Sequence, residues 1–233
     1  MNFLLHHHLA ARDLGRADAA AGAMLPDVWR MADRRARVRD SVGADPEPAL
    51  QSVSDGVAHH LAVDARFHRA PVFLDGEMAA REVMRRAPGA AKVGLFAHIA
   101  WELCLDGALL RREGTERVLG AVRDAVAAVR PDLHHRLAAA RVRLPDADRV
   151  AFEIRVDRIL DAIAAGPWVI GYTTGSGIVE RLEGLRTRFG FLPMSPADRE
   201  AIASGLEALV PEADAALGEI TYCRAPDRPA QSR

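Results

Sequence analysis

Apolar residues recur at the three- and four-residue spacing of an α-helix along most of this chain. Aromatic residues make up only 5% of it, and the abundance of alanine, leucine and arginine favours helices over strands. Pro131 and Pro145 flank a short segment, and Ser195 followed by Pro196 has the composition of a helix start. The chain is therefore predicted to be all-α. Its main helices are expected at residues 2–11, 15–37, 48–68, 72–87, 90–112, 115–129, 146–165, 177–189 and 196–219.

The length of 233 residues suits one domain with a helical extension. Hydrophobic residues make up 49% of the chain, which is enough for a core without disulfide support. All nine histidines precede residue 141, so we expect a helical domain at 1–140 and a C-terminal helical extension at 141–224 packed on it. Residues 225–233 are polar and contain proline, which is typical of a disordered tail.

The charge balance and the cysteine count exclude several classes of protein. With 31 basic and 32 acidic side chains the net charge is -1, which excludes a strongly cationic nucleic-acid binder. Cys104 and Cys223 are too few for a disulfide scaffold and lack metal-ligand spacing, which favours a reducing cytoplasm. The sequence shows no signal-peptide pattern and no run of about 18 apolar residues. We expect a cytoplasmic protein that binds no nucleic acid and spans no membrane.

Histidines and acidic residues share helical spacing in two stretches of the first 110 residues. Each set repeats every four residues, so its members lie near one face of a helix: His60, Asp64 and His68, then His98, Glu102 and Asp106. The second set lies in an apolar segment, where unpaired carboxylates would be costly. Two such stripes on neighbouring helices would converge on a divalent metal ion. The alternative is a structural polar network of hydrogen-bonded pairs.

Asp27 and the N-terminal histidines extend this set. Asp27 lies in an apolar stretch, where a carboxylate carries a desolvation cost unless it is paired or bound to a cation. His6 and His8 are about 200° apart around a helix axis, so only one of them can point inward.

Four stretches of the first 110 residues occur together in a known family. They are the opening from Met1 to Ala10 with its two histidines, the block from Gly22 to Asp27, the segment from Gly56 to Asp64 followed by Pro71, and His98. In this order and spacing they resemble the acyl carrier protein phosphodiesterases. These bacterial hydrolases remove 4'-phosphopantetheine from holo acyl carrier protein.

The resemblance implies an HD-domain-like helical bundle with a bound divalent metal, Mn or Mg in most members, while Fe or Zn also suits the residues. Three positions depart from the family pattern. Leu61 stands in place of arginine, His68 in place of an acidic residue, and Ala97 in place of the aspartate of an Asp-His pair. Glu102 or Asp106 could supply the missing carboxylate. No resemblance extends beyond about residue 131.

We therefore expect a metal-dependent phosphodiesterase that cleaves the bond between 4'-phosphopantetheine and a carrier-protein serine, or a related phosphoester. A bound metal lowers the pKa of its water from about 15.7 towards 7 and neutralises phosphoryl charge. The predicted metal ligands are His6, Asp27, His60, Asp64 and His98. Asp64 and Asp27 are the predicted catalytic carboxylates. The expected supporting or alternative ligands are His8, His68, Glu102 and Asp106.

Acyl carrier proteins are acidic, so such a partner would need a basic surface. Five arginines follow Asp27 closely: Arg30, Arg34, Arg35, Arg37 and Arg39. Their alternative role is a solvated helix end, partly compensated by Asp33 and Asp40. For the whole chain the alternative is a non-catalytic helical protein that binds metal structurally or serves as an interaction module.

Overall fold

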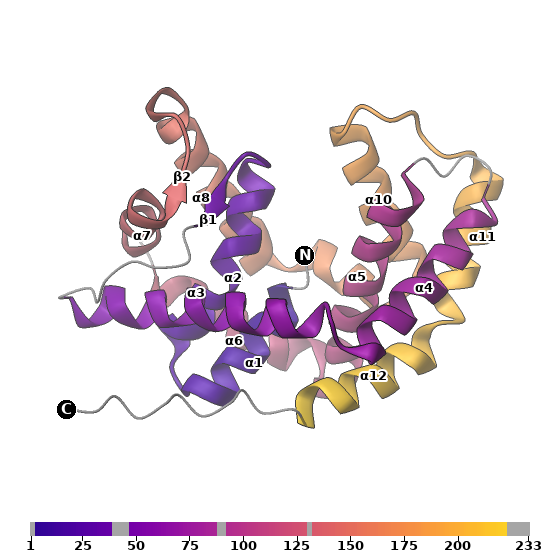
Figure 1. Ribbon diagram of the computed structural model, residues 1–233, viewed down its shortest axis with the longest axis horizontal. Coiled ribbons are helices and arrows are strands. Elements are labelled where there is room, and N and C mark those ends of the chain that lie inside the picture. Colours follow the sequence, from indigo (N-terminus) through magenta and orange to yellow (C-terminus); the bar gives the residue numbers. More distant parts are fainter. Residues whose placement is uncertain (1–2, 39–46, 88–91, 130–131, 223–233) are drawn as a thin grey trace.

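The computed structural model describes residues 3–38, 47–87, 92–129 and 132–222 (Figure 1). The described helices are α1 (Phe3–Leu14), α2 (Ala17–Ala32), α3 (Pro48–Phe67), α4 (Pro71–Arg85), α5 (Val93–Glu113), α6 (Thr115–Ala128), α7 (Leu133–Arg141), α8 (Arg149–Ala165), α9 (Pro167–Ile170), α10 (Gly175–Arg188), α11 (Pro196–Glu207) and α12 (Val210–Tyr222). The other described elements are the 3₁₀ helices η1 (Asp146–Asp148) and η2 (Gly171–Thr173) and the antiparallel strands β1 (Arg37–Val38) and β2 (Val142–Arg143). The prediction of an all-α fold is confirmed.

Most helices lie where the periodicity predicts them, and the exceptions have local causes. The helix expected at 196–219 is two helices, α11 and α12, because Pro211 has no amide hydrogen with which to continue the first. The helix expected at 15–37 ends at Ala32, where Asp33 turns into extended backbone leading to β1. The pairing of β1 with β2 was not predicted, since two-residue strands are too short to show an alternating pattern.

The helices form two groups that share one hydrophobic core (Figure 1). On one side lie α1, α2, α3, α6, α7 and α8, and on the other α4, α5, α10, α11 and α12. α5 connects the groups, because it packs against α1 and α6 as well as α4, α10 and α12.

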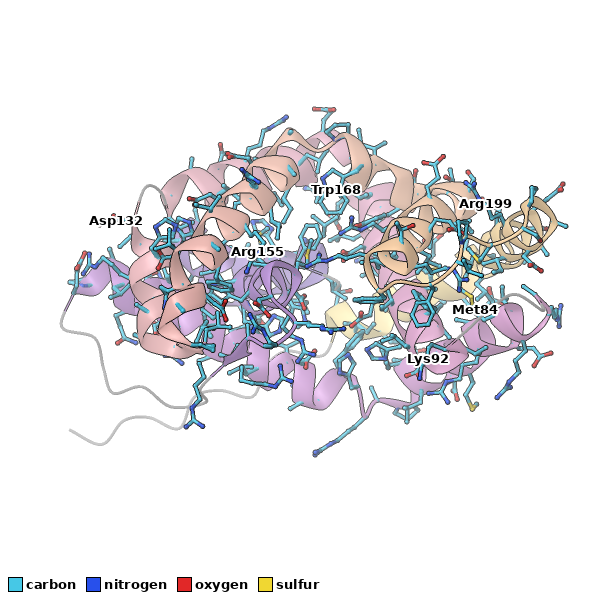
Figure 2. The ribbon with its side chains drawn as sticks, turned by 90° about the horizontal axis from the view of Figure 1, so that it is seen from above. Met84, Lys92, Asp132, Arg155, Trp168 and Arg199 are labelled. Atoms are coloured by element: carbon cyan, nitrogen blue, oxygen red, sulfur yellow. The ribbon has the colours of Figure 1, made fainter. Side chains whose placement is uncertain are left out.

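Helices that follow residue 141 are built into this core. α8 packs against α2 and α6, and α12 packs against α5 and α4. Arg155 of α8, labelled in Figure 2, donates from Nε to the carbonyl of Ala32 at the end of α2, over 2.7 Å. Phe152 and Leu217 belong to the same core cluster as the N-terminal residues, so the core is continuous across the division expected at 140. The tail expected at 225–233 lies outside the described residues.

α5 has the length and composition of a membrane-spanning helix, although the sequence was expected to contain none. The mean hydropathy of its 18-residue window is 1.5, and 78% of that window is buried inside the protein. Side chains around the whole helix are buried, including Trp101, Leu103 and Leu109. A helix covered on all sides is typical of the centre of a folded core.

Two glycines allow α2 and α3 to cross with their backbones in contact. A Cβ atom on Gly56 would lie 1.9 Å from the carbonyl oxygen of Ala19, and one on Gly22 would lie 2.1 Å from that of Val53. His60 follows Gly56 by one helical turn. The close crossing therefore brings this histidine against the backbone of α2.

Candidate metal centre

A first group of potential metal ligands joins α1 to α3. Its members are His6, His60 and Asp64, and their donor atoms all lie within 4.8 Å of one another. The imidazole rings of His6 and His60 are 3.8 Å apart between centroids, and His6 Nε2 lies 3.8 Å from Asp64 Oδ1. Both histidines are buried, while the side chain of Asp64 is 38% exposed. The group therefore lies at the edge of the core and is open to solvent on the carboxylate side.

His60 is held in the form that binds metal. Its Nδ1 lies 2.8 Å from the carbonyl oxygen of Ala23, which can only accept, so Nδ1 carries the hydrogen and Nε2 carries a lone pair. Burial, together with the neighbouring imidazole of His6, lowers the pKa of His60 to about 4, so the ring is neutral at pH 7. A backbone acceptor on the far nitrogen is a common way to orient a histidine ligand.

Both ring nitrogens of His6 are buried and could bind a metal ion. Neither Nδ1 nor Nε2 has a hydrogen-bond partner among the described residues, although the side chain is only 2% exposed. The 3.8 Å to Asp64 is too long for a hydrogen bond. A buried polar atom without a partner costs about 1 to 3 kcal/mol, and a metal ion bound at Nε2 would remove that cost.

A second group joins the C-terminal cap of α3 to α5. It consists of His68, His98 and Glu102, and Oε1 of Glu102 lies 3.4 Å from Nε2 of both histidines. These distances exceed the usual range of about 2.7 to 3.2 Å for N–H···O hydrogen bonds. They match the spacing of about 3.3 Å between ligands of a tetrahedral ion with bonds of about 2.0 to 2.1 Å. Burial raises the pKa of Glu102, but the imidazoles of His68 and His98 contribute to lowering it well below its usual value, so it is ionised at pH 7.

Asp64 connects the two groups. Its Oδ1 lies 3.8 Å from His6 Nε2 and 3.6 Å from His68 Nδ1. Burial raises the pKa of Asp64, yet the contacts with His6, His68 and His60 lower it overall, so the carboxylate keeps its charge at neutral pH. The six side chains thus form one centre of imidazole and carboxylate donors, and they fit a divalent metal ion.

Glu77 orients His98 and was missed in the sequence. Its Oε2 accepts from His98 Nδ1 over 3.2 Å, and its Oε1 accepts from Arg81 Nε over 3.0 Å. The neighbouring carboxylates of Glu102 and Glu77 raise the pKa of His98. A signal was present, since Glu77 lies on the apolar stripe of α4, four residues after Phe73 and three before Ala80.

Replacing Glu77 with glutamine should weaken metal binding by about tenfold, because the neutral amide makes His98 a less basic ligand. Titration of the EDTA-treated protein with Mn²⁺ or Zn²⁺ measures this change. Glu82→Gln is the matched control, since Glu82 lies on the same helix and pairs with the exposed Arg85 and Arg86. Equal affinities in the two variants would contradict a role of Glu77 at the centre.

Two predicted carboxylates lie outside both groups. Asp106 is completely buried and accepts from the backbone amides of Leu4 and Leu5, over 3.4 and 3.0 Å. It therefore caps the N-terminus of α1 and fixes the residue that follows, His6. Burial raises the pKa of Asp106 well above its usual value, although the hydrogen bonds from the two amides act in the opposite direction and lower it. Asp27 acts on the centre through its charge, which favours the protonated form of His60.

His8 and the arginines also lie away from the six side chains. The pKa of His8 is lowered first by burial and then by the positive charges of Arg12, Arg112 and Arg117. His8 therefore lies in basic surroundings. Of the predicted docking residues, four are exposed near the end of α2 and at β1: Arg30, Arg34, Arg35 and Arg37. The guanidinium group of Arg35 forms ion pairs inside this chain: its Nη2 lies 2.8 Å from Asp33 Oδ2 and 2.8 Å from Asp148 Oδ2. Arg39 lies outside the described residues.

Two buried histidines make the folded protein sensitive to acid. Burial lowers the pKa of His7 and of His60 from 6.5 to about 4. The unfolded chain therefore binds more protons than the folded chain between these values, and stability is lost as the pH falls through that window. From about pH 7 to about pH 4 we expect the free energy of unfolding, measured with urea in EDTA, to fall by about 3 kcal/mol for each histidine.

The variant His7→Gln isolates one of these two contributions. Within the window, its free energy of unfolding should depend less steeply on pH, by about 1.4 kcal/mol per pH unit. The slopes are compared rather than the absolute values, so a constant effect of the substitution cancels. A slope equal to that of the unmodified chain would show that His7 is not a buried neutral ring.

Comparisons with protein-family models, with curated proteins and with solved structures found no match to this chain. The function is therefore inferred from the residues of the centre.

Proposed function

We propose that this chain is a metal-dependent phosphodiesterase. The proposal depends on one observation, the convergence of four imidazoles and two carboxylates from α1, α3 and α5 at a carboxylate that faces solvent. A divalent ion bound there would activate water and neutralise charge on a phosphoryl group. The likeness of residues 1–110 to the acyl carrier protein phosphodiesterases supports the same chemistry, and an HD-domain-like bundle is the fold that this likeness implies.

The donor set favours Mn over Mg. Four of the six candidate ligands are imidazoles, and Mg²⁺ takes oxygen ligands and water in preference to nitrogen. Zn²⁺ and Fe²⁺ also accept imidazole with carboxylate, so they are the alternatives to be compared with Mn²⁺.

We assign tasks in hydrolysis to three residues of the centre. His60 and His98 present Nε2, because their Nδ1 atoms are bonded to Ala23 and Glu77. Asp64 is ionised and partly exposed, so it orients the attacking water by accepting one of its protons in a hydrogen bond. Its low pKa suits it to positioning the water more than to removing a proton completely.

An acidic carrier protein is the proposed partner. Arg30, Arg34 and Arg37 are exposed, and Arg30 follows Asp27 by about one helical turn. This exposed positive charge would attract an acidic protein and raise the association rate at low salt. The bond to be cleaved is then the phosphodiester between 4'-phosphopantetheine and the carrier serine.

Metal analysis and a phosphodiester assay test the proposal. Protein purified without a histidine tag should retain a divalent metal and hydrolyse bis(p-nitrophenyl) phosphate when Mn²⁺ is supplied. Release of 4'-phosphopantetheine from holo acyl carrier protein would then identify the substrate. Tight metal binding without turnover of any phosphoester would instead favour the non-catalytic alternative.

A further inference from the structure

A third group of metal-ligand side chains lies outside the candidate centre, between α7 and α8. His134 and His135 are in the first turn of α7, and Asp157 is in the middle of α8. The centre uses α1, α3 and α5, so neither element contributes to it. In Figure 2 the label of Asp132, next to the start of α7, lies at the end of the molecule opposite Met84 and Arg199.

Both histidines approach the same carboxylate oxygen. Nε2 of His134 lies 2.7 Å from Asp157 Oδ1, and Nε2 of His135 lies 3.2 Å from it. Consecutive residues on a helix point about 100° apart, so Asp157 must lie between the two directions. The ring centroids are 4.2 Å apart, and the three donor atoms lie within 4.8 Å of one another.

The exposure of the three side chains suits a site that an ion can enter. His134 is fully buried, whereas the side chains of His135 and Asp157 are 31% and 38% exposed. One ligand is therefore fixed in the core, and the other two face solvent.

We infer that His134, His135 and Asp157 form a separate site for a nitrogen-preferring divalent ion such as Zn²⁺ or Ni²⁺. Two imidazoles with one carboxylate are a common donor set of zinc, with water in the fourth position. The carboxylate neutralises part of the ion's charge. The 3.2 Å from His135 to Asp157 is close to the donor spacing around a tetrahedral ion, whereas the 2.7 Å from His134 is a hydrogen-bond distance that would lengthen when an ion binds.

The position of the site indicates what a bound ion would do. α7 has nine residues, fewer than the roughly 12 to 15 that make an isolated helix even marginally stable. An ion held by both helices would tie the start of α7 to the middle of α8. Because it binds the folded chain and not the unfolded one, it would also stabilise the fold.

The test uses the full-length, untagged chain and Zn²⁺ alone as the probe. After treatment with EDTA, equilibrium dialysis and metal analysis give the number of ions bound per chain. Asp157→Asn keeps the shape and one acceptor oxygen, so hydrogen bonds from the two histidines persist while the negative charge is lost. We expect this variant to bind one Zn²⁺ fewer per chain, with the affinity of the site reduced by at least about 100-fold.

Asp13→Asn is the matched control. Asp13 accepts from His59 over 3.0 Å and from Arg12 over 2.7 Å, and among the described residues no third potential metal ligand joins this pair. Its zinc stoichiometry should equal that of the unmodified chain. His135→Asn is a second test at a partly exposed position, and circular dichroism verifies that each variant is folded. An unchanged stoichiometry in folded Asp157→Asn or His135→Asn would overturn the inference, as would a chain that binds no zinc. Hydrolysis with Mn²⁺ is a separate readout and should be the same in Asp157→Asn.

Discussion

Replacing Asp64 with asparagine is expected to reduce metal-dependent hydrolysis by at least about 1000-fold. Oδ1 of Asp64 lies between the two ligand groups, 3.8 Å from His6 and 3.6 Å from His68. The amide has nearly the same shape as the carboxylate but carries no charge. Charge stabilisation by a catalytic metal is worth several kcal/mol, and about 4 kcal/mol corresponds to a factor of about 1000 in rate.

The loss should appear in both metal content and turnover. Metal analysis, turnover of bis(p-nitrophenyl) phosphate with Mn²⁺ and urea unfolding would be measured on the same preparations. Because the Asp64 side chain is 38% exposed, the metal-free variant should unfold at nearly the same urea concentration as the unmodified chain. Asp55→Asn on the same helix, which loses a pair with Arg16, should retain full activity. Full activity in Asp64→Asn would refute the assignment of the centre.

Local spacing explains why much of the centre could be predicted from the sequence. His60, Asp64 and His68 share a face of α3, and His98 and Glu102 share a face of α5, because each step is about one helical turn. Such relations depend only on the geometry of one helix. The all-α fold is likewise a sum of local patterns.

Contacts between helices could not be predicted in the same way. Each four-residue step advances about 40° around a helix, so Asp106 lies about 80° from His98. On a helix buried on all sides, that rotation leads to a different neighbour, and Asp106 meets the N-terminus of α1. Glu77 was missed because its partner, His98, is on another helix.

The third group shows the same limit. Asp132 lies three residues before His135, but the carboxylate that His134 and His135 both approach is 22 or more residues away on α8. The pairing of β1 with β2 also depends on a contact between distant segments. In each case the fold brings together residues whose sequence positions carry no common pattern.

The largest effect on stability is expected from Gly56→Ala. The new methyl group would lie 1.9 Å from the carbonyl oxygen of Ala19 and 2.8 Å from the amide nitrogen of Ala23, and both atoms belong to the backbone of α2. Backbone atoms cannot rotate away as a flexible side chain can, so the two helices must separate. We expect the free energy of unfolding to fall by about 3 kcal/mol or more, as measured by urea unfolding in EDTA.

Gly184→Ala on α10 is the matched control. No heavy atom lies within 4 Å of its added methyl group, so alanine should stabilise the protein by up to about 1 kcal/mol through helix propensity. Equal effects of the two substitutions would show that the crossing tolerates a wider spacing.

The same crossing couples stability to the metal centre. His60 Nδ1 reaches the carbonyl of Ala23 only across the contact that Gly56 permits. Separation of α2 from α3 should therefore weaken this hydrogen bond and lower metal affinity as well as stability. Gly22→Ala acts on the same contact through Val53. Once one methyl group has separated the helices, the second finds more space, so the double variant should lose less stability than the sum of the two single losses. Additive losses would indicate that the two glycines act on separate contacts.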